Sequence, residues 1–200
     1  RLPLLGAHQT DNLVTALAAF QVMLDRFAAG GAVPPAWPTR PVSEATRHGL
    51  EHVVWPARMQ RLHTQPEIWL DGAHNPQAAS ALAATLRELG DLPTALVTGM
   101  MADKDAVGFF QALAPRISRA WTVPIASERA AAPTDLARSA LIAGLAAEAA
   151  SSVETALSAA TDWATRCGGR VLIAGSLYLA GEVLAQRGGD RLFEDLPEGP

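Results

Sequence analysis

The chain has 200 residues, of which 49% are hydrophobic and 18% charged, enough apolar material for one domain or one domain and part of another. Its 16 Lys and Arg residues against 20 Asp and Glu residues give a formal net charge of −4 without any basic run, so neither a nucleic-acid nor a membrane partner is expected. No apolar stretch is long enough to cross a bilayer, and the single cysteine, Cys167, cannot form an internal disulfide, which fits a cytoplasmic protein.

The first part of the chain is predicted to contain two helices and a connector. Thr10 and Asp11 predict the cap of a helix over residues 12–31, in which apolar residues recur at helical spacing. A proline-rich connector follows at 33–41, and a short helix is predicted at 43–53. The chain starts without a methionine and enters an apolar stretch at once, so we expect this part to be the end of a larger neighbouring domain.

Strand and helix patterns alternate regularly after the hinge sequence "WPARMQRL", which leads into a strand. Apolar runs of strand length lie at 68–71, 95–99, 120–124 and 171–175. Helical patterns lie between and after them, at 76–89, 103–113, 133–145, 152–166 and 177–186. This alternation predicts an α/β fold, a doubly wound, mostly parallel sheet with helices on both faces. We therefore expect residues 57–200 to form this domain, and residues 1–56 to be the tail and linker of the preceding one.

Polar and glycine-containing sequences follow three of the predicted strands. They read "DGAHNP" from Asp71, "TGMMADKD" from Thr98 and "AGSLYLAGE" from Ala174. In open parallel sheets, ligands bind beyond the carboxyl ends of the strands. We therefore expect the three sequences to share one edge of the sheet and to form one site.

Several of these residues also have a purely structural interpretation. Asn75 and Pro76 are a typical helix cap and first helical residue, which leaves Asp71 and His74 unexplained. Asp71 is placed to accept hydrogen bonds from ligand hydroxyls such as those of a ribose. Ser176 can cap the following helix, bind an anion, or do both.

Two cationic residues are further candidates. Lys104 is the only lysine in the chain, and it either contacts a ligand or pairs with Asp103 or Asp105 at a helix start. Arg58 lies just before a strand, where its planar fork suits a phosphate, although an isolated surface arginine is usually only solvated.

The common motifs for phosphates and metals are absent from the sequence. Neither G-x-G-x-x-G nor G-x-x-x-x-G-K-[ST] occurs, so if ATP binds, this chain supplies only part of its site. His48 and His52 have the spacing of a zinc pair, but Gly49 stands where metalloproteases carry a glutamate, and no third ligand is evident. No metal site is predicted.

Taken together, the motifs resemble the C-terminal half of folylpolyglutamate synthase/dihydrofolate synthase, a member of the Mur ligase superfamily. The motifs that carry the resemblance occur in the family's order and read "LLGAHQTDN", "WPARMQ", "LDGAHNP", "GMMADKD" and "GSLYLAGE". The resemblance covers nearly the whole chain. It implies a Rossmann-like Mur ligase C-terminal domain, preceded by the helical tail of an ATP-binding central domain. The implied activity is an ATP-dependent ligase, which phosphorylates the carboxylate of dihydropteroate or folate and joins L-glutamate to the acyl phosphate.

The resemblance also implies roles for five residues. Asn12, Arg58 and Asp71 are implied to bind ATP, while His74 and Ser176 are implied to lie near the incoming glutamate. It leaves the catalytic residues unassigned. It implies no metal ligand here, because the family's phosphate-binding loop and Mg²⁺ ligands belong to the N-terminal half. The family's usual "WPGR" is "WPAR" in this chain, which alters the backbone freedom of the hinge but retains the arginine.

Two other functions remain open. One is a different Mur-type amide ligase of cell-wall synthesis, which shares the fold, although "GSLYLAGEVL" favours the folate branch. The other is a non-catalytic module that binds a nucleotide or another ligand. For the folate ligase we expect a monomer that uses ATP and Mg²⁺ and acts on small molecules, namely L-glutamate and dihydropteroate or folate.

Overall fold

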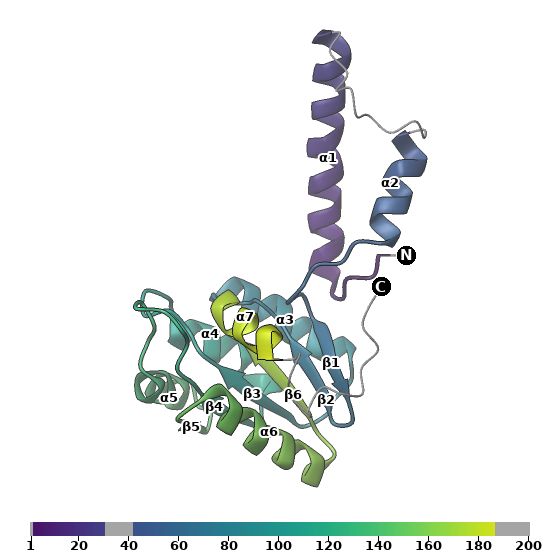
Figure 1. The fold of residues 1–200 in the computed structure, drawn as a ribbon. Helices are drawn as coiled ribbons and strands as arrows, with labels where there is room; N and C mark the ends of the chain where they lie inside the picture. Colours follow the sequence, from purple (N-terminus) through teal and green to yellow (C-terminus); the bar gives the residue numbers. More distant parts are fainter. Residues whose placement is uncertain (1, 31–41, 187–200) are drawn as a thin grey trace. The chain divides into compact units, whose positions relative to one another are not determined.

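The computed structural model describes residues 2–30 and 42–186. The chain divides into two compact units, Arg1–Trp55 and Pro56–Pro200 (Figure 1). The connector predicted at 33–41 lies outside the described residues. Within the described part, no helix combines the length and the apolar character that a membrane span needs.

The N-terminal unit contains two helices, α1 (Ala7–Gly30) and α2 (Val42–Glu51). The cap predicted at Thr10 and Asp11 is wrong, because both residues lie inside α1. Such residues cap a helix only where the backbone at their own position is extended. Here the helix starts directly after Gly6, whose φ of 98° lies in the left-handed region that glycine adopts freely.

The C-terminal unit is built on a six-stranded sheet in the order β1-β2-β6-β3-β4-β5. The strands are β1 (Gln60–Thr64), β2 (Glu67–Leu70), β3 (Thr94–Thr98), β4 (Arg119–Thr122), β5 (Ala147–Ala149) and β6 (Arg170–Ala174). All neighbours pair in parallel except β1, which is antiparallel to β2. The predicted doubly wound, mostly parallel sheet is confirmed. The short edge strand β5 was not predicted, because its sequence Ala-Glu-Ala lacks the β-branched and aromatic residues that favour strands.

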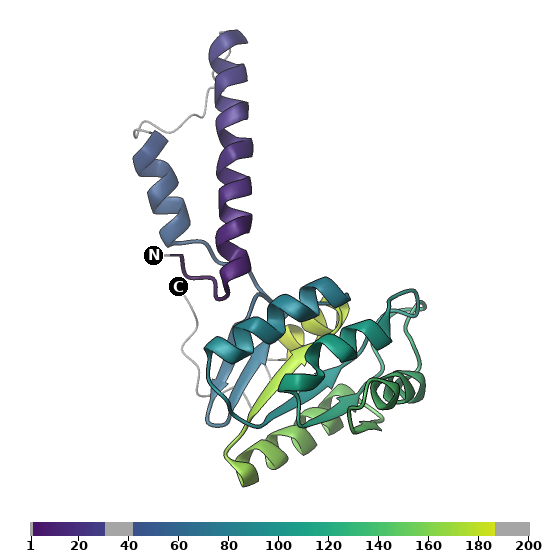
Figure 2. The same cartoon turned by 180° about the vertical axis from the view of Figure 1, so that it is seen from behind.

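Helices cover both faces of this sheet, with α6 and α7 on one face and α3 and α4 on the other (Figures 1 and 2). The helical segments are α3 (Pro76–Glu88), α4 (Ala106–Leu113) with the 3₁₀ turn η1 (Ala114–Arg116), α5 (Pro133–Ile142), α6 (Val153–Cys167) and α7 (Leu177–Gln186). Two ends differ from the prediction. α4 begins late because the Asp105 side chain caps it by accepting from Gly108 N at 2.9 Å. α5 ends early, just before Gly144, whose φ is 79°.

The core follows the alternation of side chains along the strands. One set of strand residues packs with α6 and α7 in a single buried cluster; it includes Ile68, Leu70, Val97, Val171, Ile173, Val153, Leu157 and Val183. The helices on the other face bury their own apolar side chains, Leu82, Leu86, Phe109, Phe110 and Leu113. The four inner strands are therefore enclosed on both sides, whereas the edge strands β1 and β5 remain partly exposed.

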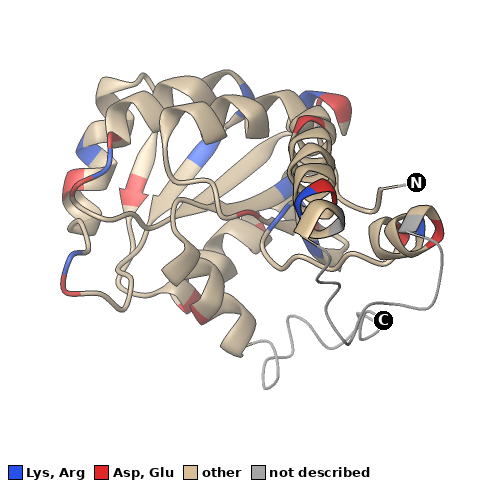
Figure 3. Cartoon of the chain, turned by 90° about the horizontal axis from the view of Figure 1, so that it is seen from above, with Lys and Arg blue, Asp and Glu red and all other residues tan. Residues whose placement is uncertain are grey.

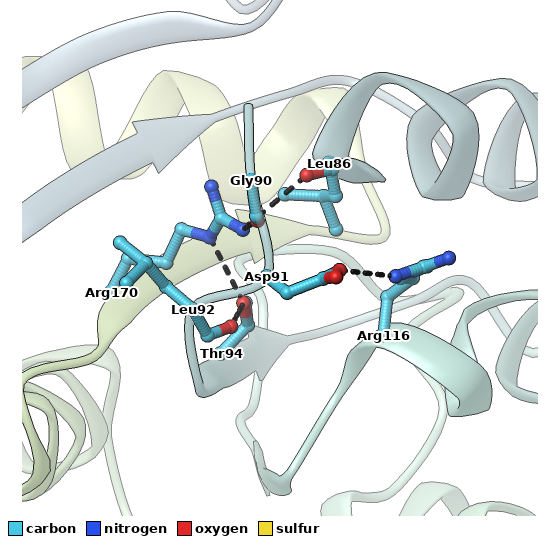
Figure 4. A network of polar contacts seen from close by, with 7 residues as sticks. All are labelled: Leu86, Gly90, Asp91, Leu92, Thr94, Arg116 and Arg170. Atoms are coloured by element: carbon cyan, nitrogen blue, oxygen red, sulfur yellow. Dashed lines mark hydrogen bonds and ion pairs between the residues drawn. The ribbon is translucent and has the colours of Figure 1, made fainter. Parts of the chain in front are cut away.

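A buried arginine closes the amino-terminal edge of the sheet (Figure 4). Arg170, at the start of β6, is only 2% exposed. Its Nε donates to Thr94 Oγ1 at 3.1 Å, and its Nη2 donates to Leu86 O at 3.3 Å and to Gly90 O. These two carbonyls belong to the C-terminal end of α3 and the turn after it, where backbone acceptors lack helical partners. Arg170 thus joins α3 to the start of two strands.

The Arg170 guanidinium is desolvated, and two acidic side chains lie near it. Desolvation on burial lowers the pKa of its guanidinium, while the charges of Glu67 and Asp91 raise it. Asp91 is itself held by Arg116, with 2.7 Å between Oδ1 and Nη1 (Figure 4). The buried charge is therefore retained by hydrogen bonds to carbonyls, with carboxylates at longer range.

We predict that Arg170→Met lowers the free energy of unfolding by about 1–3 kcal/mol, because it leaves buried carbonyls without a donor. Urea unfolding followed by circular dichroism measures the change. The matched control is Arg138→Met, whose side chain is 72% exposed and pairs with Asp135 one helical turn away. That variant should change stability by less than about 0.5 kcal/mol. Equal losses in the two variants would contradict a stabilising role for the buried network.

Candidate functional site

The carboxyl ends of β2, β6 and β3 lie side by side. The sequences "DGAHNP", "AGSLYLAGE" and "TGMMADKD" follow these strands, so the prediction that they share one edge is confirmed. Among the described residues β6 is the last strand, yet it inserts between β2 and β3, so the strand order reverses there. Such a reversal is where ligands bind in open α/β sheets.

A pocket of about 200 Å³ opens at this edge. Its lining residues come from the three motif loops and from the loop after β4; they are His74, Met101, Lys104, Arg129, Gly175, Ser176, Leu177 and Tyr178. Ligand pockets for drug-sized molecules span roughly 300–1,000 Å³, so this one suits a smaller substrate. The structure therefore brings together His74, Ser176 and Lys104. It also adds Arg129, which no motif marks in the sequence.

Asp71 lies directly after β2 and is 7% exposed. Its Oδ2 accepts a hydrogen bond from Met59 N at 2.9 Å, and its Oδ1 accepts one from Ala73 N at 2.8 Å. Gly72 N also donates to Ala57 O at 2.9 Å. The carboxylate and its neighbour thus fasten the hinge segment that contains Arg58 to the end of the strand.

Arg58 lies between two residues with left-handed backbones, since φ is 55° at Ala57 and 44° at Met59. The alanine in "WPAR" therefore adopts the conformation that glycine prefers, at a cost of roughly 1–2 kcal/mol. Arg58 is half-buried, and its Nη1 donates to Ala57 O at 3.0 Å. A Cβ atom on Gly72 would lie 2.7 Å from this Nη1 and 2.5 Å from Leu177 Cδ2, so a side chain at this position would displace the guanidinium from the loop.

His74 is half-buried, and its Nδ1 lies 2.9 Å from Gly72 O. Because a carbonyl oxygen only accepts, Nδ1 must carry the proton of this hydrogen bond. In the neutral ring, Nε2 is then the acceptor. Next to it, Asn75 caps α3 by accepting from Ala78 N at 2.8 Å, and Pro76 begins that helix, so the structural interpretation of both residues is confirmed.

Ser176 is 3% exposed and caps α7, since its Oγ accepts from Tyr178 N at 3.0 Å. The hydroxyl proton takes no part in that bond and can still be donated. The turn before it requires glycine, because Gly175 has a φ of 122° and a Cβ atom there would overlap Thr98 Oγ1. Gly175 N also donates to Ala73 O at 2.8 Å, which ties the loops after β6 and β2 together.

Lys104 forms an ion pair and also lines the pocket, so its structural and its ligand-binding interpretations are compatible. Its Nζ lies 3.5 Å from Asp103 Oδ2, which is the predicted ion pair at the helix start, and it also lines the pocket. Asp105 does not pair with it but caps α4. Asp103 has a second cationic neighbour, because its Oδ1 lies 3.1 Å from Arg129 Nη2.

Asn12 belongs to the N-terminal unit and is described within that unit only. It is exposed on α1, where its Nδ2 donates to Gln9 Oε1 at 3.2 Å. In the same unit, the rings of His48 and His52 stack with centroids 4.2 Å apart. Among residues 2–30 and 42–186, no group of three or more His, Cys, Asp or Glu side chains is arranged to hold a metal ion.

Comparison with known proteins identifies the family. The profile described as "Mur ligase, glutamate ligase domain" matches residues 57–177. Folylpolyglutamate synthase of Lacticaseibacillus casei is 31% identical over 132 residues, which cover 66% of this chain and 28% of the relative.

Solved structures agree with this assignment. Mycobacterium tuberculosis folylpolyglutamate synthase complexed with ADP and AMPPCP is 30% identical, with a TM-score of 0.80 over 94% of this chain and 42% of that chain. A bifunctional folylpolyglutamate synthase/dihydrofolate synthase with Mn, AMPPNP and L-glutamate bound is 31% identical, with a TM-score of 0.63 over 75% of this chain and 35% of that one. The chain spans less than half the length of these relatives. The resemblance found in the motifs is confirmed, and the chain belongs to the Mur ligase family that contains the glutamate ligase domain.

Proposed function

We propose that this chain is the C-terminal part of an ATP-dependent ligase that adds L-glutamate to dihydropteroate or folate through an acyl phosphate. The observation that carries the proposal is the pocket in which His74 and Ser176 meet at the carboxyl edge of the sheet. The relatives named above, with nucleotides or L-glutamate bound, support this assignment over a cell-wall ligase or a non-catalytic module.

On the nucleotide side, Arg58 lies in the hinge and Asp71 lies at the end of β2, to which the hinge is tied through Met59 N. The two residues are proposed to bind ATP together. The arginine fork suits the phosphates. The Asp71 carboxylate is held at the end of β2 by backbone hydrogen bonds to both of its oxygens, and it is proposed to accept a hydrogen bond from a ribose hydroxyl. Asn12, in the N-terminal unit, is also proposed to bind the nucleotide. The ligands of Mg²⁺ are proposed to lie in the N-terminal half of the full-length protein.

On the amino-acid side, His74 and Ser176 have complementary hydrogen-bonding roles. The Nε2 atom of neutral His74 is an acceptor for the amine, which must lose a proton when the amide bond forms. The Ser176 hydroxyl is a donor for a carboxylate, and the N-terminus of α7 beside it favours negative charge. These groups bind and orient the amine, so that it attacks the acyl carbon and displaces phosphate.

The proposed division is a central-domain tail at 1–56 and a C-terminal domain at 57–200. Support for the first part comes from α1, which exposes the apolar side chains Val14, Leu17, Val22 and Met23 by 61%, 36%, 57% and 39%. Such a surface is typical of a helix that packs against another domain. Acidic and basic residues are both scattered over the described ribbon, without a long run of one sign (Figure 3). The substrates are proposed to be small molecules, and the protein is proposed to be a cytoplasmic monomer.

We predict that residues 1–200 alone do not turn over ATP. Transfer of the γ-phosphoryl group requires a backbone cradle and a metal, and the sequence contains no phosphate-binding loop. The measurement is glutamate-dependent ADP release with dihydropteroate or a reduced folate, first with this chain and then after the N-terminal half is added separately. Activity only in the mixture is expected, whereas turnover by residues 1–200 alone would contradict the division of the site.

We predict that Asp71→Ala abolishes discrimination between ATP and its 2′- or 3′-deoxy analogue in the full-length enzyme. A hydrogen bond to a charged group contributes about 1.5–3 kcal/mol, so the wild-type KM should favour ATP by about tenfold or more. Because the same substitution removes two backbone contacts, stability should also fall. Discrimination that survives in Asp71→Ala would leave this residue with only its structural role.

We predict that Arg58→Lys raises the KM for ATP about tenfold or more, although the positive charge is preserved, because a lysine lacks the bidentate fork. The control is Arg61→Lys, on the neighbouring strand β1, where the exposed side chain lies over the Trp69 ring. Steady-state kinetics of the two variants, with melting temperatures, separate the effects. An unchanged KM in Arg58→Lys would show that the fork makes no contact with the phosphates.

A further inference from the structure

The pocket beside His74 has a positively charged rim. Lys104 and Arg129 both line it, and none of its lining residues is Asp or Glu. This local excess contrasts with the formal net charge of −4 for the whole chain. A pocket with two cations, an imidazole and a hydroxyl favours a negatively charged ligand.

The position of Arg129 is fixed by its backbone. Met101, in the loop after β3, forms an isolated antiparallel bridge with Ala130, in the loop after β4. Ala102 N donates to Arg129 O at 2.8 Å within the same contact. The two loops are therefore fastened to each other, and Arg129 is brought to the loop that contains Lys104.

Asp103 holds both cations from outside the pocket. Its oxygens lie 3.1 Å from Arg129 Nη2 and 3.5 Å from Lys104 Nζ, so the cluster keeps one positive charge in excess. Desolvation raises the pKa of Asp103. The charges of Lys104 and Arg129 and the local hydrogen bonds together lower it by more, so the net shift is downward and the carboxyl stays ionised. The Arg129 side chain is 69% exposed and that of Asp103 49% exposed. Ion pairs as exposed as this are weak, so the guanidinium can take a second carboxylate at little cost.

We propose that Arg129, positioned by Asp103 and accompanied by Lys104, binds a carboxylate of the substrate in the His74 and Ser176 pocket. This inference rests on the proposed function and adds a substrate-binding residue to it. The carboxylate comes either from the incoming amino acid or from a glutamyl group already on the acceptor. Both sources present the same planar group, which an arginine fork binds through two parallel hydrogen bonds.

The test uses the full-length enzyme with Arg129→Gln and Arg129→Lys. KM values are measured for L-glutamate, for an acceptor without a glutamyl group and for acceptors with one or several glutamyl groups. Arg129→Gln should raise the KM of the substrate that it contacts about tenfold with kcat nearly unchanged, as expected for loss of uniform binding. Arg129→Lys should lie between this variant and the wild type.

The matched control is Arg116→Gln. Arg116 also forms one ion pair with a surface aspartate, 2.7 Å from Asp91, but it precedes β4 and so lies at the opposite edge of the sheet. Its loss should leave every KM within about twofold of the wild-type value.

The substrate series separates the two sources of the carboxylate. A rise confined to L-glutamate assigns Arg129 to the incoming amino acid. A rise confined to acceptors that carry glutamyl groups assigns it to the acceptor chain. If Arg129→Gln behaves like Arg116→Gln for all substrates, the inference is overturned.

The positioning role of Asp103 has its own readout. Asp103→Asn should raise the same KM by a smaller factor, and most of that factor should disappear in the Arg129→Gln background, because the two residues act as one unit. If the KM increases of the two single variants multiply in the double variant, the two residues act independently, and the positioning role of Asp103 is overturned. Failure of the wild-type enzyme to release ADP in response to glutamate would instead refute the proposed function, so the two failures are distinguishable.

Discussion

The site depends on the pairing of β6 between β2 and β3. This pairing brings the end of the described chain beside loops that precede it by many residues, and it places Ser176 next to His74. Gly175 permits it, because any side chain there would overlap Thr98. A hydrogen bond from Gly175 N to Ala73 O also fixes the distance between the loop after β6 and the loop after β2. The site therefore forms only when β6 has paired with both β2 and β3, so its geometry depends on the stability of the core around these strands.

Polar groups at this edge have structural contacts as well as proposed contacts with ligands. Asp71 fastens the hinge through Met59 N, and Ser176 caps α7 through Tyr178 N. The bond at Ser176 uses an acceptor position of the hydroxyl, whose proton can still be donated to a ligand. Structural and binding interpretations of such residues are thus compatible. The structural bonds fix the side chains in place before a ligand arrives, which reduces the entropy lost on binding.

Much of the fold and part of the site could be predicted from the sequence. Apolar runs followed by polar motifs predict both the parallel strands and the edge at which His74 and Ser176 meet, because parallel strands point the same way. Arg129 could not be predicted, since its place depends on the bridge between Met101 and Ala130, and such contacts between loops leave no periodic pattern. The strand Ala147–Ala149 was missed for a related reason, because its pairing with β4 decides its conformation and its composition does not.

Arg170 and Arg129 carry the same side chain at opposite edges of the sheet, and burial determines what each can do. Arg170 donates to carbonyls and a hydroxyl in a dry environment, so exchanging those partners for a ligand would leave buried acceptors unpaired. Arg129 pairs with the exposed carboxylate of Asp103, and water can solvate that carboxylate when the ion pair opens. A strong, buried network suits a fixed contact between α3 and the strands. A weak, solvated ion pair suits a substrate that must bind and leave in every turnover. The cations that can exchange partners, Lys104 and Arg129, accordingly lie at the carboxyl edge of the sheet.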